Sequence, residues 1–256
     1  LQWIGEVSWI YERTFHVGRG FLLMEVKELV FEGLDTRATV LVNGEQALSA
    51  DNMFREWRVD CAGLVREGEN RIRIVFDPPF GERDPPADSL FLELPGGRRV
   101  LTRKAAFHSG WDWAPRLLTC GIWRPVRLEG WDRARIRSVS PRLVRLEGDL
   151  AVCAASIAVE STGDAPLAVR ISVDGRDAAA GRLAAQGPDT IEALFSIDSP
   201  ELWWPSGMGA QRLYDIEARL LVGGTGAPRG GEILDRCSCS LGLRTVELVT
   251  SVDTSG

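Results

Sequence analysis

Apolar and polar residues alternate with a period of two along most of this 256-residue chain. Successive side chains of a strand point to opposite faces of a sheet, so this period predicts strands with one buried face. The alternating segments are residues 38–42, 71–76, 122–129, 150–160, 169–173, 190–197, 213–221 and 237–243. Asn43-Gly44 is typical of a two-residue hairpin turn, and Pro125 indicates an edge strand or a bulge. Because no segment has sustained helical periodicity, the pattern predicts an all-β protein built from β-sandwiches.

The distribution of tryptophan divides the chain near Trp131. Seven of the nine tryptophans lie in residues 1–131, and only Trp203 and Trp204 lie beyond them. We therefore predict two consecutive β-sandwiches, an aromatic-rich one over residues 1–131 and a smaller one over residues 132–247. Two further segments lack a period and are rich in turn-forming residues, so they are predicted as long loops: residues 80–97 and 223–231.

Composition and charge argue against several classes of protein. Apolar residues make up 45% and charged residues 26% of the chain, which is typical of a soluble globular protein. The net charge of −6, with no separate cluster of lysine and arginine, argues against a nucleic-acid partner. No apolar run approaches the ~20 residues that span a bilayer, so no membrane segment is predicted.

The five cysteines fit neither a disulfide framework nor a metal-binding pattern. Cys237-Ser-Cys239 has the wrong spacing for a zinc knuckle, and no histidine lies near it. We interpret all five as reduced thiols, which indicates a cytoplasmic origin, and no metal is predicted.

Residues 107–115, Phe-His-Ser-Gly-Trp-Asp-Trp-Ala-Pro, are the part of the chain most informative about function. Indole faces stack on the C–H faces of sugars, and an ionised aspartate accepts hydrogen bonds from neighbouring hydroxyls. Trp111 and Asp112 would thus suit a monosaccharide subsite. The alternative is a strand in which Trp111 and Trp113 share the core face and Asp112 faces solvent. Taken by itself, the motif favours this core-packing interpretation.

Further motifs extend over nearly the whole chain. They are residues 9–15, 29–36, 40–44, 51–57, 103–115, 119–126, 202–207 and 241–248. In these motifs the chain resembles the β-mannosidases of glycoside hydrolase family 2, and Trp111-Asp112-Trp113 distinguishes that branch from galactosidases and glucuronidases. The resemblance implies a galactose-binding-like jelly roll over residues 1–131 and an immunoglobulin-like sandwich over residues 132–247. Residues 248–256 would then be a linker toward a (β/α)₈ catalytic barrel that this chain does not contain.

The resemblance also changes the interpretation of the Trp-Asp-Trp motif. It implies that a loop of the first domain reaches the pocket of the barrel, where Trp111 forms a wall and Asp112 accepts hydrogen bonds from mannose hydroxyls. Trp113 is then expected to pack inward and steady the loop. His108 and Arg103 are candidates to support these residues from behind. For His108 a surface or core position remains the favoured alternative, and for Arg103 a solvated strand end is an equal one.

Two positions depart from the family pattern. Ala114 stands where the family usually has glycine, and Ser109 stands where an aromatic residue is common. Glycine alone adopts a positive φ at little cost, so an alanine at this point predicts a different setting of the loop.

Catalysis is not expected from this chain alone. Retaining glycosidases use two carboxyl groups about 5–5.5 Å apart, and in the family both are glutamates on barrel strands. None of the 36 acidic residues lies in a motif resembling these sites, so no catalytic residue is assigned. The resemblance implies no cofactor, the enzyme's own barrel as partner and β-mannoside oligosaccharides as substrates. Two alternatives remain: a stand-alone carbohydrate-binding module, and the same domains from a β-galactosidase- or β-glucuronidase-like parent.

Overall fold

The computed structural model describes residues 2–80, 97–163, 165–183, 189–223 and 232–250. The chain divides into two compact units, residues 1–131 and 132–256. In both units almost every regular element is an antiparallel strand, which confirms the predicted all-β class. The long loops predicted at residues 80–97 and 223–231 lie largely outside the described residues.

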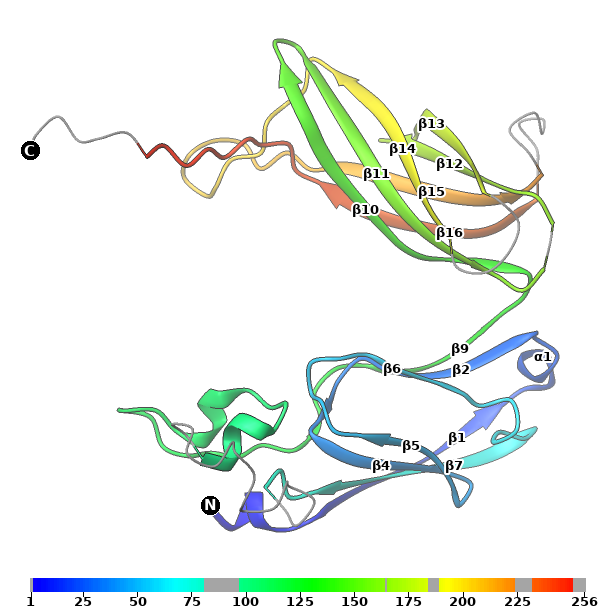
Figure 1. The fold of residues 1–256 in the computed structure, drawn as a ribbon. Coiled ribbons are helices and arrows are strands. Elements are labelled where there is room, and N and C mark those ends of the chain that lie inside the picture. The colour runs from blue at the N-terminus through cyan, green and yellow to red at the C-terminus, as the bar shows by residue number, and fades with distance from the viewer. Residues whose placement is uncertain (1, 81–96, 164, 184–188, 224–231, 251–256) are drawn as a thin grey trace, which may run out of the picture. The chain divides into compact units, whose positions relative to one another are not determined.

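The first unit is a sandwich of two main sheets (Figure 1). One sheet has the strand order β1 (Trp9–Val17), β7 (Gly68–Asp77), β4 (Arg37–Val42), β5 (Glu45–Ala50). The other has the order β6 (Trp57–Asp60), β2 (Val26–Phe31), β9 (Val126–Trp131). A short pair, β3 (Leu34–Asp35) with β8 (Gly121–Ile122), lies outside both sheets. The inward faces of the sheets form one apolar core that includes Phe31, Val40 and Phe76.

Strand β4 shows how the alternating pattern produces this sandwich. Val40 and Val42 are fully buried, whereas Thr39 and Leu41 are only partly buried. The two residues that follow the strand, Asn43 and Gly44, both have positive φ values, 52° and 94°. Positive φ at both central residues is the signature of a type I′ turn, the connection that matches the twist of two antiparallel strands. The hairpin predicted from Asn43-Gly44 is therefore confirmed.

The second unit is a seven-stranded sandwich. One sheet has the order β10 (Ala134–Glu147), β11 (Leu150–Ser161), β14 (Asp189–Asp198). The other has the order β13 (Arg176–Leu183), β12 (Leu167–Val173), β15 (Tyr214–Val222), β16 (Ile233–Leu241). Ile157, Ile171, Ile216 and Leu220 are fully buried in its core. No residue belongs to the apolar cores of both units, so each sandwich has a hydrophobic core of its own.

In the described residues, helical structure is confined to short turns. They are α1 (Arg19–Leu22) and the 3₁₀ helices η1 (Gln2–Glu6), η2 (Gly97–Leu101) and η3 (Ala106–Ser109). Among the described residues, no helix has the length and apolar character that crossing a membrane requires.

The strand predicted over residues 122–129 is interrupted. β8 ends at Ile122 and β9 begins at Val126, so three residues leave the ladder between them. The reason is that the Trp123 side chain packs on Gly33, and its Nε1 donates a hydrogen bond of 3.0 Å to the Met53 carbonyl. Pro125, which lacks a backbone N–H, fits this break in the strand.

Replacing Gly33 by alanine is expected to lower the free energy of unfolding of the first sandwich by about 1–3 kcal/mol, the usual cost of overpacking. A Cβ at this position would lie 2.4 Å from Trp123 Nε1. Gly63, around which nothing lies within 4 Å, provides the control. Gly63→Ala is expected to change stability by no more than about 1 kcal/mol. Equal effects of the two substitutions in urea denaturation would contradict the packing of Trp123 on Gly33.

Candidate functional site

The Trp-Asp-Trp motif lies in a compact loop, residues 105–118, and not in a strand. The loop begins with η3 and turns at Gly110, whose φ is 97°. Trp111 and Ala114 exchange two backbone hydrogen bonds of 3.2 Å, and the Leu117 N–H donates to the His108 carbonyl at 3.1 Å. The loop is thus closed by its own backbone and lies at the same end of the sandwich as η1 (Figure 1).

The two indoles of the loop are both turned toward solvent. Trp111 is 59% exposed and Trp113 is 83% exposed, and their rings meet edge to face with centroids 6.3 Å apart. The expectation that Trp113 packs inward is therefore wrong, and so is the interpretation of both residues as sandwich core. The tight turn from Trp111 to Ala114 reverses the chain, and so short a loop has no interior that could enclose an indole.

The tip of the loop presents the chemistry of a sugar contact. Asp112 is exposed and stands between Trp111 and Trp113 in the sequence, and the two indole rings meet nearly at right angles, 86°. Aromatic faces cover the apolar side of a pyranose, and a carboxylate accepts hydrogen bonds from its hydroxyls. Glycosidases need two carboxyl groups, one as nucleophile and one as proton donor, and the indoles and the single carboxylate of the tip cannot supply such a pair. The arrangement can therefore bind and orient a sugar, and it does not by itself provide hydrolysis.

An ion pair lies beneath the loop. Lys104 Nζ donates hydrogen bonds of 2.6 Å to both carboxylate oxygens of Asp35, and the two side chains are 3% and 4% exposed. A third bond, of 2.7 Å, reaches the Thr119 carbonyl. Burial lowers the pKa of Lys104, and the Asp35 carboxylate opposes that shift. Lys104 therefore pairs with Asp35.

His108 joins the loop to this ion pair. Its Nδ1 lies 3.4 Å from Thr119 Oγ1, and Thr119 Oγ1 donates to Asp35 Oδ2 at 2.8 Å. Burial, and then the positive charge of Lys104, lower the pKa of His108, which favours the neutral imidazole at pH 7. His108 is partly buried, and its supporting role stays a prediction.

Arg103 lies in an isolated bridge with Asn52 and not at the end of a strand, and its supporting role stays a prediction. Its side chain is exposed, while its carbonyl accepts a hydrogen bond of 3.0 Å from the Met53 N–H. The backbone of Arg103 therefore helps to fix the start of the loop, and its guanidinium group is directed to solvent.

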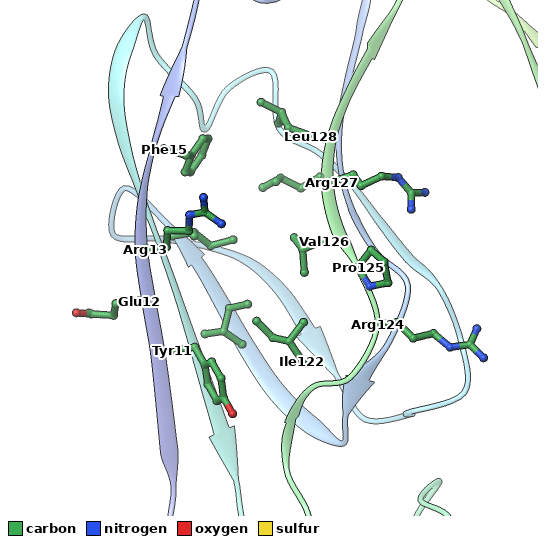
Figure 2. A pocket seen from close by; sticks show the side chains of 13 residues that line it. Tyr11, Glu12, Arg13, Phe15, Ile122, Arg124, Pro125, Val126, Arg127 and Leu128 are labelled. Atoms are coloured by element: carbon green, nitrogen blue, oxygen red, sulfur yellow. The ribbon is translucent and has the colours of Figure 1, made fainter.

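A cavity of the first sandwich lies away from this loop. It has a volume of about 510 Å³ and opens between the edge strands β1 and β9. In Figure 2 the side chains of Tyr11, Ile122 and Val126 approach one another across it, while Glu12 points away. Its lining is mostly aliphatic and aromatic, so it offers few partners for sugar hydroxyls. The lining includes no residue of the 105–118 loop. Because the cavity offers few partners for sugar hydroxyls, the loop and not the cavity is the candidate site.

Comparison with known proteins assigns the two sandwiches to one class of enzyme. Residues 1–124 match the galactose-binding domain-like profile of glycosyl hydrolase 2, and residues 135–244 match the profile of glycosyl hydrolases family 2. The chain therefore belongs to glycoside hydrolase family 2, of which it contains two β-domains.

The most informative relatives are β-mannosidases. β-Mannosidase B of Thermothelomyces thermophilus is 34% identical over 267 residues, covering 97% of this chain and 29% of that protein. β-Mannosidase B of Aspergillus fumigatus is 34% identical over 270 residues, covering 100% of this chain and 30% of that protein. The chain thus spans about 30% of the length of these curated relatives.

Solved structures give the same picture of the fold. β-D-Mannosidase from Dictyoglomus thermophilum superposes with a TM-score of 0.85 at 33% identity, covering 100% of this chain and 32% of that one. The exo-chitosanase CsxA of Amycolatopsis orientalis, at 24% identity, superposes with a TM-score of 0.70 over 95% of this chain and 26% of its own. The latter likeness concerns the fold alone.

Proposed function

We propose that this chain is the non-catalytic N-terminal part of a β-mannosidase that removes terminal β-D-mannose from oligosaccharides. Its 105–118 loop supplies Trp111 and Asp112 to the subsite of the terminal sugar, while both catalytic glutamates belong to a (β/α)₈ barrel. The observation that carries the proposal is the exposed Trp-Asp-Trp tip on a loop closed by its own hydrogen bonds. The relatives named β-mannosidase support the choice of sugar.

In this role the chain binds and orients the sugar without reacting with it. Trp111 covers the apolar face of the terminal mannose, and the Asp112 carboxylate accepts hydrogen bonds from its hydroxyls. Fixing the sugar in this way places its anomeric carbon between the two carboxyl groups of the barrel, which carry out a double displacement. The two sandwiches brace the barrel, and the chain alone does not turn over substrate.

Replacing Asp112 by alanine in the protein extended to the length of its relatives is expected to lower kcat/KM for 4-nitrophenyl β-D-mannopyranoside. Loss of charge-assisted hydrogen bonds worth about 1.5–3 kcal/mol corresponds to a decrease of about 10- to 150-fold. Asp198→Ala, which removes an exposed carboxylate from β14, is the control and should leave kcat/KM unchanged.

Three other results would redirect the assignment. Turnover by residues 1–256 alone would exclude a non-catalytic role. Binding of mannosides to residues 1–256 in calorimetry, with the extended protein indifferent to Asp112, would favour a stand-alone carbohydrate-binding module. Preference of the extended protein for a β-galactoside or a β-glucuronide would assign the domains to a parent of that specificity.

A further inference from the structure

One ion pair fastens both ends of the 105–118 loop. Lys104 directly precedes the loop and Thr119 directly follows it. The Lys104 ammonium group binds Asp35 Oδ1, Asp35 Oδ2 and the Thr119 carbonyl at 2.6–2.7 Å. Asp35 belongs to β3, which pairs with β8, and β8 begins two residues after Thr119. The two ends of the loop are therefore held together and tied to the sandwich through the same carboxylate.

The hydrogen bonds of this cluster have one consistent arrangement. The three protons of the Lys104 ammonium group match its three short contacts. The Thr119 hydroxyl donates to Asp35, and its oxygen has two lone pairs: one faces Lys104 Nζ at 3.3 Å and the other can accept the Nδ1–H of a neutral His108. A continuous path thus runs from the buried carboxylate of Asp35 through Thr119 to the ring of His108, which is inside the loop.

Apolar packing does little to fix the loop. Its large apolar side chains Phe107, Trp111, Trp113 and Leu117 are exposed, and Leu118, at its very end, is the one that is buried. A loop whose buried apolar side chains, Ala105 and Leu118, lie only at its two ends keeps its shape mainly through hydrogen bonds and its attachment at the base. The attachment at the base consists of charged, buried groups, Lys104 and Asp35, joined by hydrogen bonds that depend on direction. It therefore holds the loop in a narrower range of positions than a few apolar contacts would.

From this geometry we propose that Asp35, Lys104 and Thr119 are positioning residues for the sugar subsite. They touch no substrate, and they act by setting where Trp111 and Asp112 lie. The inference rests on the proposed function of the loop. For a group that orients a substrate, a misplacement by about 1 Å is sufficient to slow the reaction on the order of 100-fold. Asp35, Lys104 and Thr119 lie in three of the motifs by which the chain resembles the family, and the resemblance as given above assigns them no role.

The experiment compares Thr119→Val, Thr119→Ser and Asp35→Asn in the protein extended to the length of its relatives. Valine keeps the shape of threonine without the hydroxyl, whereas serine keeps the hydroxyl. Amide hydrogen exchange of residues 108–117 and the kinetics of 4-nitrophenyl β-D-mannopyranoside hydrolysis are measured for each variant, together with its melting temperature.

We expect Thr119→Val to raise amide exchange within the loop by about 5-fold and to raise KM, with kcat and the melting temperature little changed. Thr119→Ser should restore both the exchange and KM to those of the unsubstituted protein. Asp35→Asn should act in the same direction and lower kcat/KM by at least about 10-fold. Arg142→Met, which removes an exposed ion pair on β10, is the control for a general effect of lost charge.

The proposal and the function on which it rests fail in different ways. If amide exchange of residues 108–117 is unchanged in both Thr119→Val and Asp35→Asn, the Asp35, Lys104 and Thr119 cluster does not hold the loop. Faster exchange with unchanged kcat/KM, in a protein that still loses activity with Asp112→Ala, would overturn the positioning role and leave the subsite intact. Activity that is indifferent to Asp112→Ala would overturn the proposed function itself.

Discussion

Replacing Lys104 by methionine is expected to lower the free energy of unfolding of the first sandwich by about 3–5 kcal/mol, the largest effect of any single charge removal in the described part of the chain. The side chain is 3% exposed and its partner Asp35 is 4% exposed, so the substitution leaves an ionised carboxylate without compensation in a medium that solvates it poorly. The Thr119 carbonyl loses its donor at the same time. Denaturation in guanidinium chloride, followed by tryptophan fluorescence, measures the change.

The matched control is an ion pair of the same charge type on the surface. Arg142 and Glu192 have side chains that are 55% and 57% exposed, so Arg142→Met should cost no more than about 1 kcal/mol. The double variant Lys104→Met with Asp35→Asn should be more stable than Lys104→Met alone, because the unpaired charge is then also removed. If Lys104→Met lowers the free energy of unfolding no more than Arg142→Met does, the buried Lys104–Asp35 ion pair does not stabilise the first sandwich.

Most of the strands could be predicted because they are buried on one face. β4, β7 and β14 have the alternating burial that their sequences show, since every second side chain lies on a core and those between are more exposed. β11 alternates in the same way except at Cys153, Ala154 and Ala155, which are all buried. β13 carries no such signal: Ala178, Ala179 and Ala180 are of one size and polarity, so nothing in the pattern marks a buried face. β10 is an edge strand with two register shifts, and it could not be predicted from a strict period either.

The candidate site could be predicted only in part, and the missed part has a physical cause. Trp111 and Asp112 were found because their chemistry is local to one short motif. The exposure of Trp113 was missed because it depends on a turn, from Trp111 to Ala114, that the sequence does not mark with a glycine. Asp35 was not predicted at all, since it meets Lys104 across 69 positions and Thr119 across 84. Motif spacing carries no information about contacts that only the folded sheets create.

Two core substitutions test whether the sandwiches are separate folding units. Phe31→Ala is expected to destabilise the first sandwich by about 3–5 kcal/mol, and Ile216→Ala the second by about 2–5 kcal/mol, because each side chain is fully buried and leaves a cavity. Each variant is the control for the other. The two core clusters share no residue, so each substitution should move the unfolding of its own unit and leave the other in place.

The distribution of tryptophan allows the unfolding of the two sandwiches to be followed separately in one sample. Seven of the nine tryptophans lie in residues 1–131, so fluorescence reports mainly on the first sandwich, whereas far-ultraviolet circular dichroism reports on the strands of both. Phe31→Ala should shift the fluorescence midpoint and only part of the dichroism change. Ile216→Ala should shift the remaining part and leave the fluorescence midpoint nearly unchanged. A common shift of both signals in either variant would mean that the sandwiches unfold as one cooperative unit, and the stability of the 105–118 loop would then depend on both cores.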